Sequence, residues 1–200
     1  MLARYLARQF GRPRGSVGRW LIAPWLDRIS AATNRLALER LDVRPGDRVL
    51  EVGFGGGALL RMLAAHGAPV SGADVSPEMV ERSSRFDVRL APAERLPFED
   101  GSFDKAVSVN SLYFWRDPAA ALAELARVLR PGGRLVLCFE PPEELRKWPG
   151  HVHGFRLLEV AQVRALVEGA GFGRVEEAWG TGRKPARFCA LSAARAGANG

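Results

Sequence analysis

The feature that most constrains the fold is a glycine-rich run, EVGFGGG at residues 51–57, which follows an apolar segment and precedes a helical one. Glycine permits positive φ angles and lets the backbone approach a ligand closely. The N-terminus of the following helix adds a partial positive charge. A strand, a glycine turn and a helix in this order predict a doubly wound α/β fold that binds a small molecule at the carboxyl end of the strand.

From about residue 47 onward, short β-type runs alternate with helical patterns, which predicts a mostly parallel sheet with crossover helices. We expect strands at 48–53, 69–75, 87–91, 103–109, 133–140, 174–179 and 187–192, and helices at 57–67, 77–85, 118–130 and 159–171. Asp117 and Pro118 favour a helix start, because one caps free amides and the other suits the first turn. The 200 residues fit one domain, 46–192, with a frayed tail at 193–200.

Residues 1–45 form a different kind of segment, with apolar residues at helical spacing and Arg between them. Residues 1–48 hold ten Arg against four acidic residues, which is most of the net charge of +7. We favour a helical N-terminal lid over the site. Two alternatives stay open: contact with a membrane surface, anchored by Trp20 and Trp25, and an RNA-binding arm. No recognisable RNA-binding module accompanies it, which disfavours nucleic acid as a partner.

The two cysteines, Cys138 and Cys189, stand apart from each other and from any His or Cys cluster. Such spacing disfavours a zinc site and predicts buried free thiols, so we expect no bound metal. The N-terminus lacks the apolar core and cleavage site of a signal peptide. The apolar runs are also shorter than the roughly 20 residues of a membrane-spanning helix. We therefore expect a cytoplasmic protein.

Two carboxylates narrow the choice of ligand. Asp74 ends the second expected strand, where an acidic residue accepts hydrogen bonds from the ribose hydroxyls of adenosine cofactors. Residues 53–58 also satisfy the GxGxxA pattern of nicotinamide cofactor sites. Glu51 argues against that cofactor, because a carboxylate beside the loop repels a pyrophosphate. It would attract the ammonium and sulfonium groups of S-adenosylmethionine (SAM).

Four blocks in the same order resemble the class I SAM-dependent methyltransferases, especially the ubiquinone/menaquinone-methyltransferase-like branch with its methyltransferase type 11 domain. The blocks are VLEVGFGGG, GADVSPEMVERS, APAERLPFEDGSFDKAVSVNSLYFWRDP and ELARVLRPGGRLVL. The resemblance implies a Rossmann-like, seven-stranded sheet whose last strand is antiparallel. It also implies SAM as the cofactor.

The resemblance assigns cofactor contacts by position. Glu51, Gly53, Gly55 and Gly57 would line the methionine part of SAM, Asp74 would hold the ribose, and Val75, Ala93 and Glu94 would surround the adenine. Asn110, which ends the fourth expected strand, would lie nearest the transferring methyl group. The chain departs from the pattern at Pro92, because the family often has Asp or Asn there. Adenine recognition would then depend on backbone groups or on Glu94.

Three residues are candidates for a catalytic role: Asn110, Tyr113 and His153. Tyr113 has a hydroxyl that seeks a partner, whereas Phe114 and Trp115 suit either the site wall or the core. His153, with His151, follows the fifth expected strand, where an acceptor loop would lie. We expect methyl transfer to a small-molecule acceptor. The alternatives are a nucleic-acid or protein methyltransferase that docks its substrate on the basic segment, and a SAM-binding module without chemistry.

Overall fold

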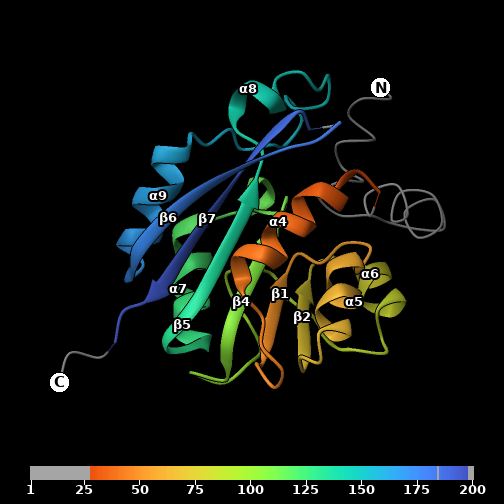
Figure 1. Cartoon of the computed structure of the whole chain (residues 1–200). Helices are drawn as coiled ribbons and strands as arrows, with labels where there is room; N and C mark the ends of the chain where they lie inside the picture. Colours follow the sequence, from red (N-terminus) through yellow and green to blue (C-terminus); the bar gives the residue numbers. More distant parts are fainter. Residues whose placement is uncertain (1–27, 184, 198–200) are drawn as a thin grey trace.

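The computed structural model describes residues 28–183 and 185–197. Seven strands form one sheet in the order β3-β2-β1-β4-β5-β7-β6 (Figure 1). The strands are β1 (Val49–Val52), β2 (Val70–Asp74), β3 (Asp87–Leu90), β4 (Phe103–Val109), β5 (Leu129–Phe139), β6 (Phe172–Thr181) and β7 (Arg187–Arg195). In this order, the neighbouring strands from β3 through β5 are parallel to one another. Strand β7 is antiparallel to both of its neighbours, β5 and β6. The predicted Rossmann-like sheet with an antiparallel last strand is confirmed.

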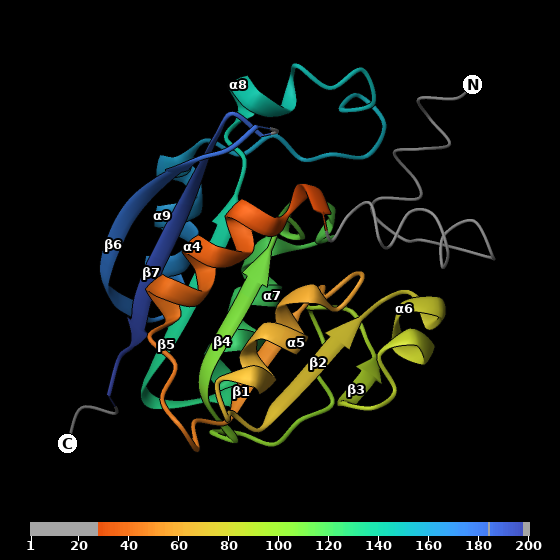
Figure 2. The same cartoon turned by 45° about the vertical axis from the view of Figure 1, so that its right-hand side comes forward.

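Helices cover both faces of the sheet (Figure 2). They are α4 (Ala31–Leu41), α5 (Ala58–Ala65), α6 (Pro77–Arg82), α7 (Pro118–Val128), α8 (Pro142–Leu145) and α9 (Val160–Gly169), with a 3-10 turn, η2 (Leu112–Phe114). Helices α4 and α5 share one apolar cluster with side chains of β1, β4, β5 and β7. Helices α7 and α9 share a second cluster on the opposite face. This burial on both faces explains why the central strands β1 and β4 are buried along nearly their whole length, whereas the edge strands β3 and β6 are mostly exposed.

Helix starts match the local sequence signals. The Asp117 carboxylate accepts hydrogen bonds from the amides of Ala119 (3.0 Å) and Ala120 (3.1 Å), and Pro118 occupies the first turn of α7. The Ser76 hydroxyl caps α6 in the same way, again followed by a proline. These caps satisfy amides that have no partner within the helix. They fix where the chain turns away from the ends of the strands that border the site.

Some bounds differ from the expected ones. Strand β5 begins at Leu129 and not at residue 133, because Leu129 pairs with Phe103 before the register shifts. Strand β7 runs through Arg195 into the expected tail, since Ala193 and Ala194 pair with β5. The short helix α8, which a proline starts, was not expected.

The segment expected to be a lid is described only from residue 28 onward. Its helix α4 is part of the core and not a separate cover: Ala37 and Leu41 are fully buried against the sheet. Lys105 of β4 holds the end of this helix by donating a hydrogen bond of 2.9 Å to the carbonyl of Leu41. Residues 1–27 lie outside the described residues. Within the described ranges, no helix is both long enough and apolar enough to span a membrane.

Candidate functional site

The glycine loop joins β1 to α5 at the carboxyl edge of the sheet. Gly53, Gly55 and Gly57 all have positive φ, at 75°, 48° and 77°. A Cβ on Gly53 would lie 2.4 Å from the Cβ of Ser111, and one on Gly57 would lie 2.8 Å from the Ser83 hydroxyl. A Cβ on Gly55 would meet nothing within 4 Å. Gly53 and Gly57 are therefore required for packing, whereas Gly55 presents bare backbone to open space.

Asp74 ends β2 beside this loop. Its Oδ2 accepts a hydrogen bond from the Gly55 amide (3.0 Å), and its Oδ1 accepts one from the Ser76 amide (2.9 Å). Burial raises the pKa of Asp74 above its usual value, while the hydrogen bonds from Ser76, Gly55 and Val75 lower it. The carboxylate thus fixes the shape of the loop and also lines the cavity in front of it.

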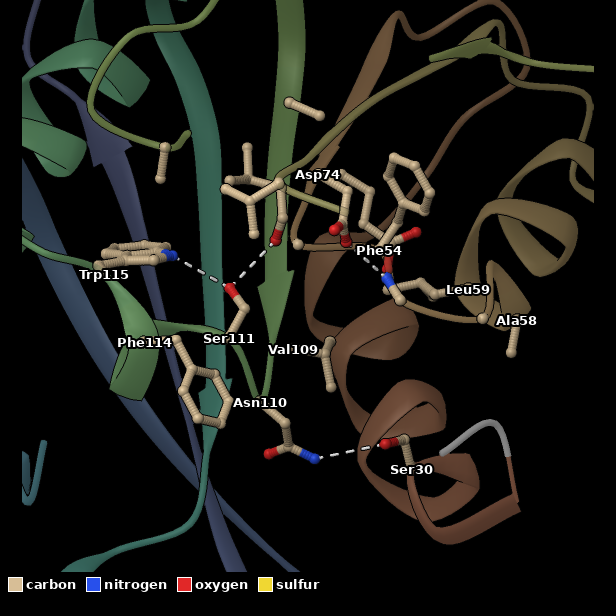
Figure 3. A pocket seen from close by; sticks show the side chains of 18 of the residues that line it. Ser30, Phe54, Ala58, Leu59, Asp74, Val109, Asn110, Ser111, Phe114 and Trp115 are labelled. Atoms are coloured by element: carbon tan, nitrogen blue, oxygen red, sulfur yellow. Dashed lines mark hydrogen bonds between the residues drawn. The ribbon is translucent and has the colours of Figure 1, made fainter. Parts of the chain in front are cut away.

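A first cavity lies between the glycine loop, the start of α4 and the ends of β2 and β4 (Figure 3). It collects eight of the nine residues that the sequence assigned to the cofactor: Glu51, Gly53, Gly55, Asp74, Val75, Ala93, Glu94 and Asn110. Gly57 is absent from the lining, because it starts α5 and packs near Ser83. Glu51 is buried within β1, at 3% exposed, and Val75 is 36% exposed. One carboxylate oxygen of Glu94 accepts a hydrogen bond from the Asp117 amide (3.0 Å).

Asn110 follows β4 in a left-handed backbone conformation, with φ of 52°, which residues other than Gly rarely adopt. Its amide donates to the Cys138 carbonyl of β5 at 2.9 Å, which holds it in place. Its side-chain Nδ2 lies 3.5 Å from the Ser30 hydroxyl, and its Oδ1 accepts from the Tyr113 hydroxyl at 3.2 Å. Figure 3 shows the Asn110 amide directed toward Ser30.

A second cavity adjoins the first, and Ser30, Asn110 and Phe114 line both. Its remaining wall includes the rings of Tyr113, Trp148 and Phe155, the acids Glu140 and Glu144, and residues near the β6–β7 turn. Phe114 therefore belongs to the site. Trp115 is 7% exposed and lines only the first cavity. Its indole N–H donates to the Ser111 hydroxyl (3.2 Å), which also donates to the Val52 carbonyl.

Tyr113, a predicted catalytic candidate, forms hydrogen bonds with two other residues of the second cavity. The Glu140 amide donates a hydrogen bond to the Tyr113 oxygen, and the Tyr113 hydroxyl donates to Asn110. Burial, together with the negative charge of Glu140, raises the pKa of Tyr113 well above its usual value. The phenol therefore stays protonated at neutral pH and acts as a hydrogen-bond donor.

His153 lies away from these groups. It is exposed in the loop after α8, and neither it nor His151 lines either cavity. The backbone there forms turns, in which the His153 amide donates to the Gly150 carbonyl at 3.0 Å. The structure thus gives His153 no contact with the site. Among residues 28–183 and 185–197, no three His, Cys, Asp or Glu side chains gather as they would around a metal ion.

Sequence reasoning missed several lining residues. Ser30 directly precedes α4 and Asn34 lies in its first turn, and Glu140, Trp148 and Phe155 come from the chain after β5. One signal was present for Glu140: it directly follows the fifth strand, as Asn110 follows the fourth, and such ends meet at the ligand-binding edge of the sheet. Trp148 and Phe155 lie in a loop whose path the sequence does not specify.

Comparisons with known proteins agree with this geometry. Residues 50–137 match a family model described as a methyltransferase domain. The matched part includes the glycine loop, Asp74 and Asn110. Over 111 residues the chain is 43% identical to a demethylmenaquinone methyltransferase of Tropheryma whipplei, which covers 52% of this chain and 46% of that protein. Over these parts of its length the chain is therefore similar to methyltransferases.

Solved structures of other proteins share this fold. A chain from the Haloferax volcanii complex between the Trm112 methyltransferase activator and a methyltransferase aligns with a TM-score of 0.80 and 23% identity, covering 87% of this chain and 93% of that one. A SAM-dependent methyltransferase of Thermotoga maritima aligns with a TM-score of 0.74 and 21% identity, covering 96% and 99%. The chain spans about half the length, or less, of curated relatives that it matches.

Proposed function

We propose that the chain transfers a methyl group from SAM to a small-molecule acceptor bound in the second cavity. The observation that carries the proposal is the shared wall, because Ser30, Asn110 and Phe114 border both cavities. A cofactor in the first cavity and an acceptor in the second would meet across these side chains. Methyl transfer requires such a meeting, since donor and nucleophile must be aligned at near-contact distance.

The residues of the first cavity fit this cofactor. SAM supplies a methyl group already activated by a sulfonium. Gly55 leaves open space where a side chain would obstruct a ligand, and Asp74 offers carboxylate oxygens that can accept from ribose hydroxyls. The buried Glu51 favours a cationic ligand over a pyrophosphate.

The residues between the cavities orient the reactants. Tyr113 donates to the Asn110 oxygen, which leaves the Asn110 amide nitrogen directed toward Ser30 and the cavities. This fixed amide can hold a polar group of the acceptor or of the cofactor. Phe114 supplies an apolar surface on both sides, which excludes water from the approach of the nucleophile.

The lining of the second cavity favours a small molecule over a polymer. Aromatic side chains form much of its wall, which is typical of small-ligand pockets. The alternative of a nucleic-acid or protein substrate depends on the Arg-rich segment, most of which lies outside the described residues.

The test is transfer of a radiolabelled methyl group from SAM into separate pools of small molecules, lipid, RNA and protein, after titration of SAM by calorimetry. We expect SAM binding and label in the small-molecule pool. Label confined to RNA or protein would overturn the proposed acceptor class. Absence of both SAM binding and label would overturn the proposal that the chain is a SAM-dependent methyltransferase.

A pair of variants assigns the second cavity to the acceptor. Ala186 lines this cavity, so Ala186→Trp should fill it and abolish transfer while the affinity for SAM is unchanged. Ala165→Trp is the matched control, because Ala165 is exposed on α9 and lines neither cavity. Equal transfer by both variants would place the acceptor elsewhere.

A further inference from the structure

The second cavity combines aromatic rings with a carboxylate. The Phe155 ring contacts the other three rings, with its centroid 4.6 Å from that of Phe114, 5.9 Å from that of Tyr113 and 6.4 Å from that of Trp148. All four rings line the cavity. Aromatic faces carry partial negative charge and attract cations. These walls therefore accept either an apolar body or an organic cation.

Glu140 supplies the charge. It follows β5, is half-buried and lines the cavity beside Tyr113. Among the described residues the Glu140 carboxylate makes no hydrogen bond or ion pair. The hydrogen bond between Glu140 and Tyr113 comes from the Glu140 backbone amide, which donates to the Tyr113 oxygen. Burial first, and then the charge of Glu144, raises the pKa of Glu140 to about 7. The structure thus holds an acid whose charge the protein does not neutralise there.

The other charged groups on the cavity wall do not offset Glu140. Glu144 is itself paired with Lys147, whose Nζ lies 2.6 Å from its Oε1. The Lys147 side chain is 62% exposed, and Arg183 is also exposed. Tyr113, with its raised pKa, stays neutral. The charge left facing the aromatic rings is therefore that of the Glu140 carboxylate.

A partly buried carboxylate without a counter-ion costs free energy, because the protein replaces only part of its hydration. A bound cation removes that cost and gains the attraction of the rings. A neutral ligand leaves the carboxylate unpaired, and an anionic ligand adds repulsion. The same cavity thus discriminates among ligands of equal shape by their charge.

We propose that the acceptor is a small molecule with an ammonium group that is held by Glu140 and the surrounding rings, so that Glu140 determines specificity. Because an ammonium nitrogen has no free lone pair, the methyl group goes to another nucleophilic atom of the acceptor. This inference rests on the proposed function, because it assigns the second cavity to the acceptor. The Glu140 backbone amide donates to Tyr113, which in turn donates to Asn110, so the backbone of Glu140 is linked to the shared wall.

The test is calorimetry on the full chain saturated with S-adenosylhomocysteine, with 2-phenylethylamine, 2-phenylethanol and phenylacetate as probes of similar shape. We expect the amine to bind about tenfold or more tightly than the alcohol, the scale of one charge-assisted hydrogen bond, and the carboxylate to bind most weakly. Equal or undetectable binding of the amine would overturn the inference. Tightest binding of phenylacetate would assign the cavity to anions through Lys147 or Arg183.

The variant Glu140→Gln keeps the shape and removes the charge. We expect it to erase the preference for the amine while S-adenosylhomocysteine binds as before, which shows that the protein is folded. Glu143→Gln is the matched control, because Glu143 is an exposed acid of α8 that does not line the cavity. A preference that survives Glu140→Gln overturns the inference.

A pH series adds a readout that a purely structural role would not change. Protonation of Glu140 removes its charge, so the wild-type affinity for the amine should fall as the pH drops below about 7 and stay level in Glu140→Gln. Binding of this kind does not depend on turnover. An amine preference without any methyl transfer would contradict only the proposed function, and methyl transfer without an amine preference would contradict only this inference.

Discussion

Asp74 serves two structural purposes at one position. Its two oxygens accept backbone hydrogen bonds from opposite sides, Gly55 in the glycine loop and Ser76 at the start of α6. Loss of this side chain would therefore loosen the loop as well as remove an acceptor from the cavity. Removal of the Asp74 side chain should therefore weaken cofactor binding more than the loss of one hydrogen bond to the ligand would.

We predict that Asp74→Ala weakens SAM binding by roughly 1.5–3 kcal/mol, the scale for losing charge-assisted hydrogen bonds. Calorimetry at fixed pH measures the change. Asp87→Ala is the control, because Asp87 is an exposed carboxylate on the neighbouring strand β3 and does not line the cavity. A change in affinity of less than about twofold for Asp74→Ala would mean that the ribose is held elsewhere.

Gly55 offers a test that separates backbone strain from obstruction of the ligand. Gly55→Val should abolish SAM binding, because the side chain would occupy the open space of the cavity and would be strained at φ of 48°. Gly46→Val carries comparable strain, with φ of 87° and open space around it, but lies away from the cavity. We expect both variants to lose some stability in thermal unfolding and only Gly55→Val to lose SAM. Loss of binding in both would attribute the effect to strain.

At the scale of elements, helix α4 explains what the sequence could and could not predict. Its apolar spacing predicted a helix correctly, but that pattern does not name the surface the helix covers. The long-range partners of Ala37 and Leu41, such as Val136 and Phe188, lie about a hundred residues or more away in sequence. The glycine loop, Asp74 and Asn110 were predictable because each lies at the end of a strand or directly after it. Trp148 and Phe155 depend on how a loop folds back, which no local pattern specifies.

The opposite edge of the sheet is held by charges. Asp104, at the start of β4, forms ion pairs with Arg48, just before β1 (3.1 Å), and with Arg130 of β5 (2.7 Å). Burial alone would raise the pKa of Asp104, but hydrogen bonds from the side chain and backbone of Arg48 and from Arg130 hold it well below its usual range. One side chain thereby ties three neighbouring strands together.

We predict that Asp104→Asn lowers the free energy of unfolding by roughly 1–2 kcal/mol at pH 7, with the value reduced because both Arg side chains are about half exposed. The folded pKa lies below the unfolded one, so this stabilisation is present above the unfolded value of 3.8 and is lost as the pH falls below it. Urea unfolding at pH 7 and at lower pH measures the difference. A gap between wild type and variant that does not shrink below about pH 4 would contradict the assignment.

For the whole molecule, the part played by residues 1–27 is open to a direct test. The sequence predicts that this segment acts as a lid, and Ile29 and Ser30, the described residues that follow it, line the second cavity. Deleting residues 1–27 should leave the affinity for SAM largely unchanged and severely reduce methyl transfer, because a cover excludes water and orients the acceptor. Full activity on a small acceptor, combined with loss of salt-sensitive binding to anionic vesicles or RNA, would identify a membrane or RNA arm in its place.

The position of β7 has a consequence for how the sheet assembles. It is the last of the seven strands in sequence, yet it lies between β5 and β6 and pairs with both. Strands β1 to β5 can form their ladder as they emerge from the ribosome, whereas β6 has no neighbour until β7 has been synthesised. During that interval β6 and the exposed side of β5 are open edges, which is when chaperone binding or edge-to-edge aggregation would compete with folding.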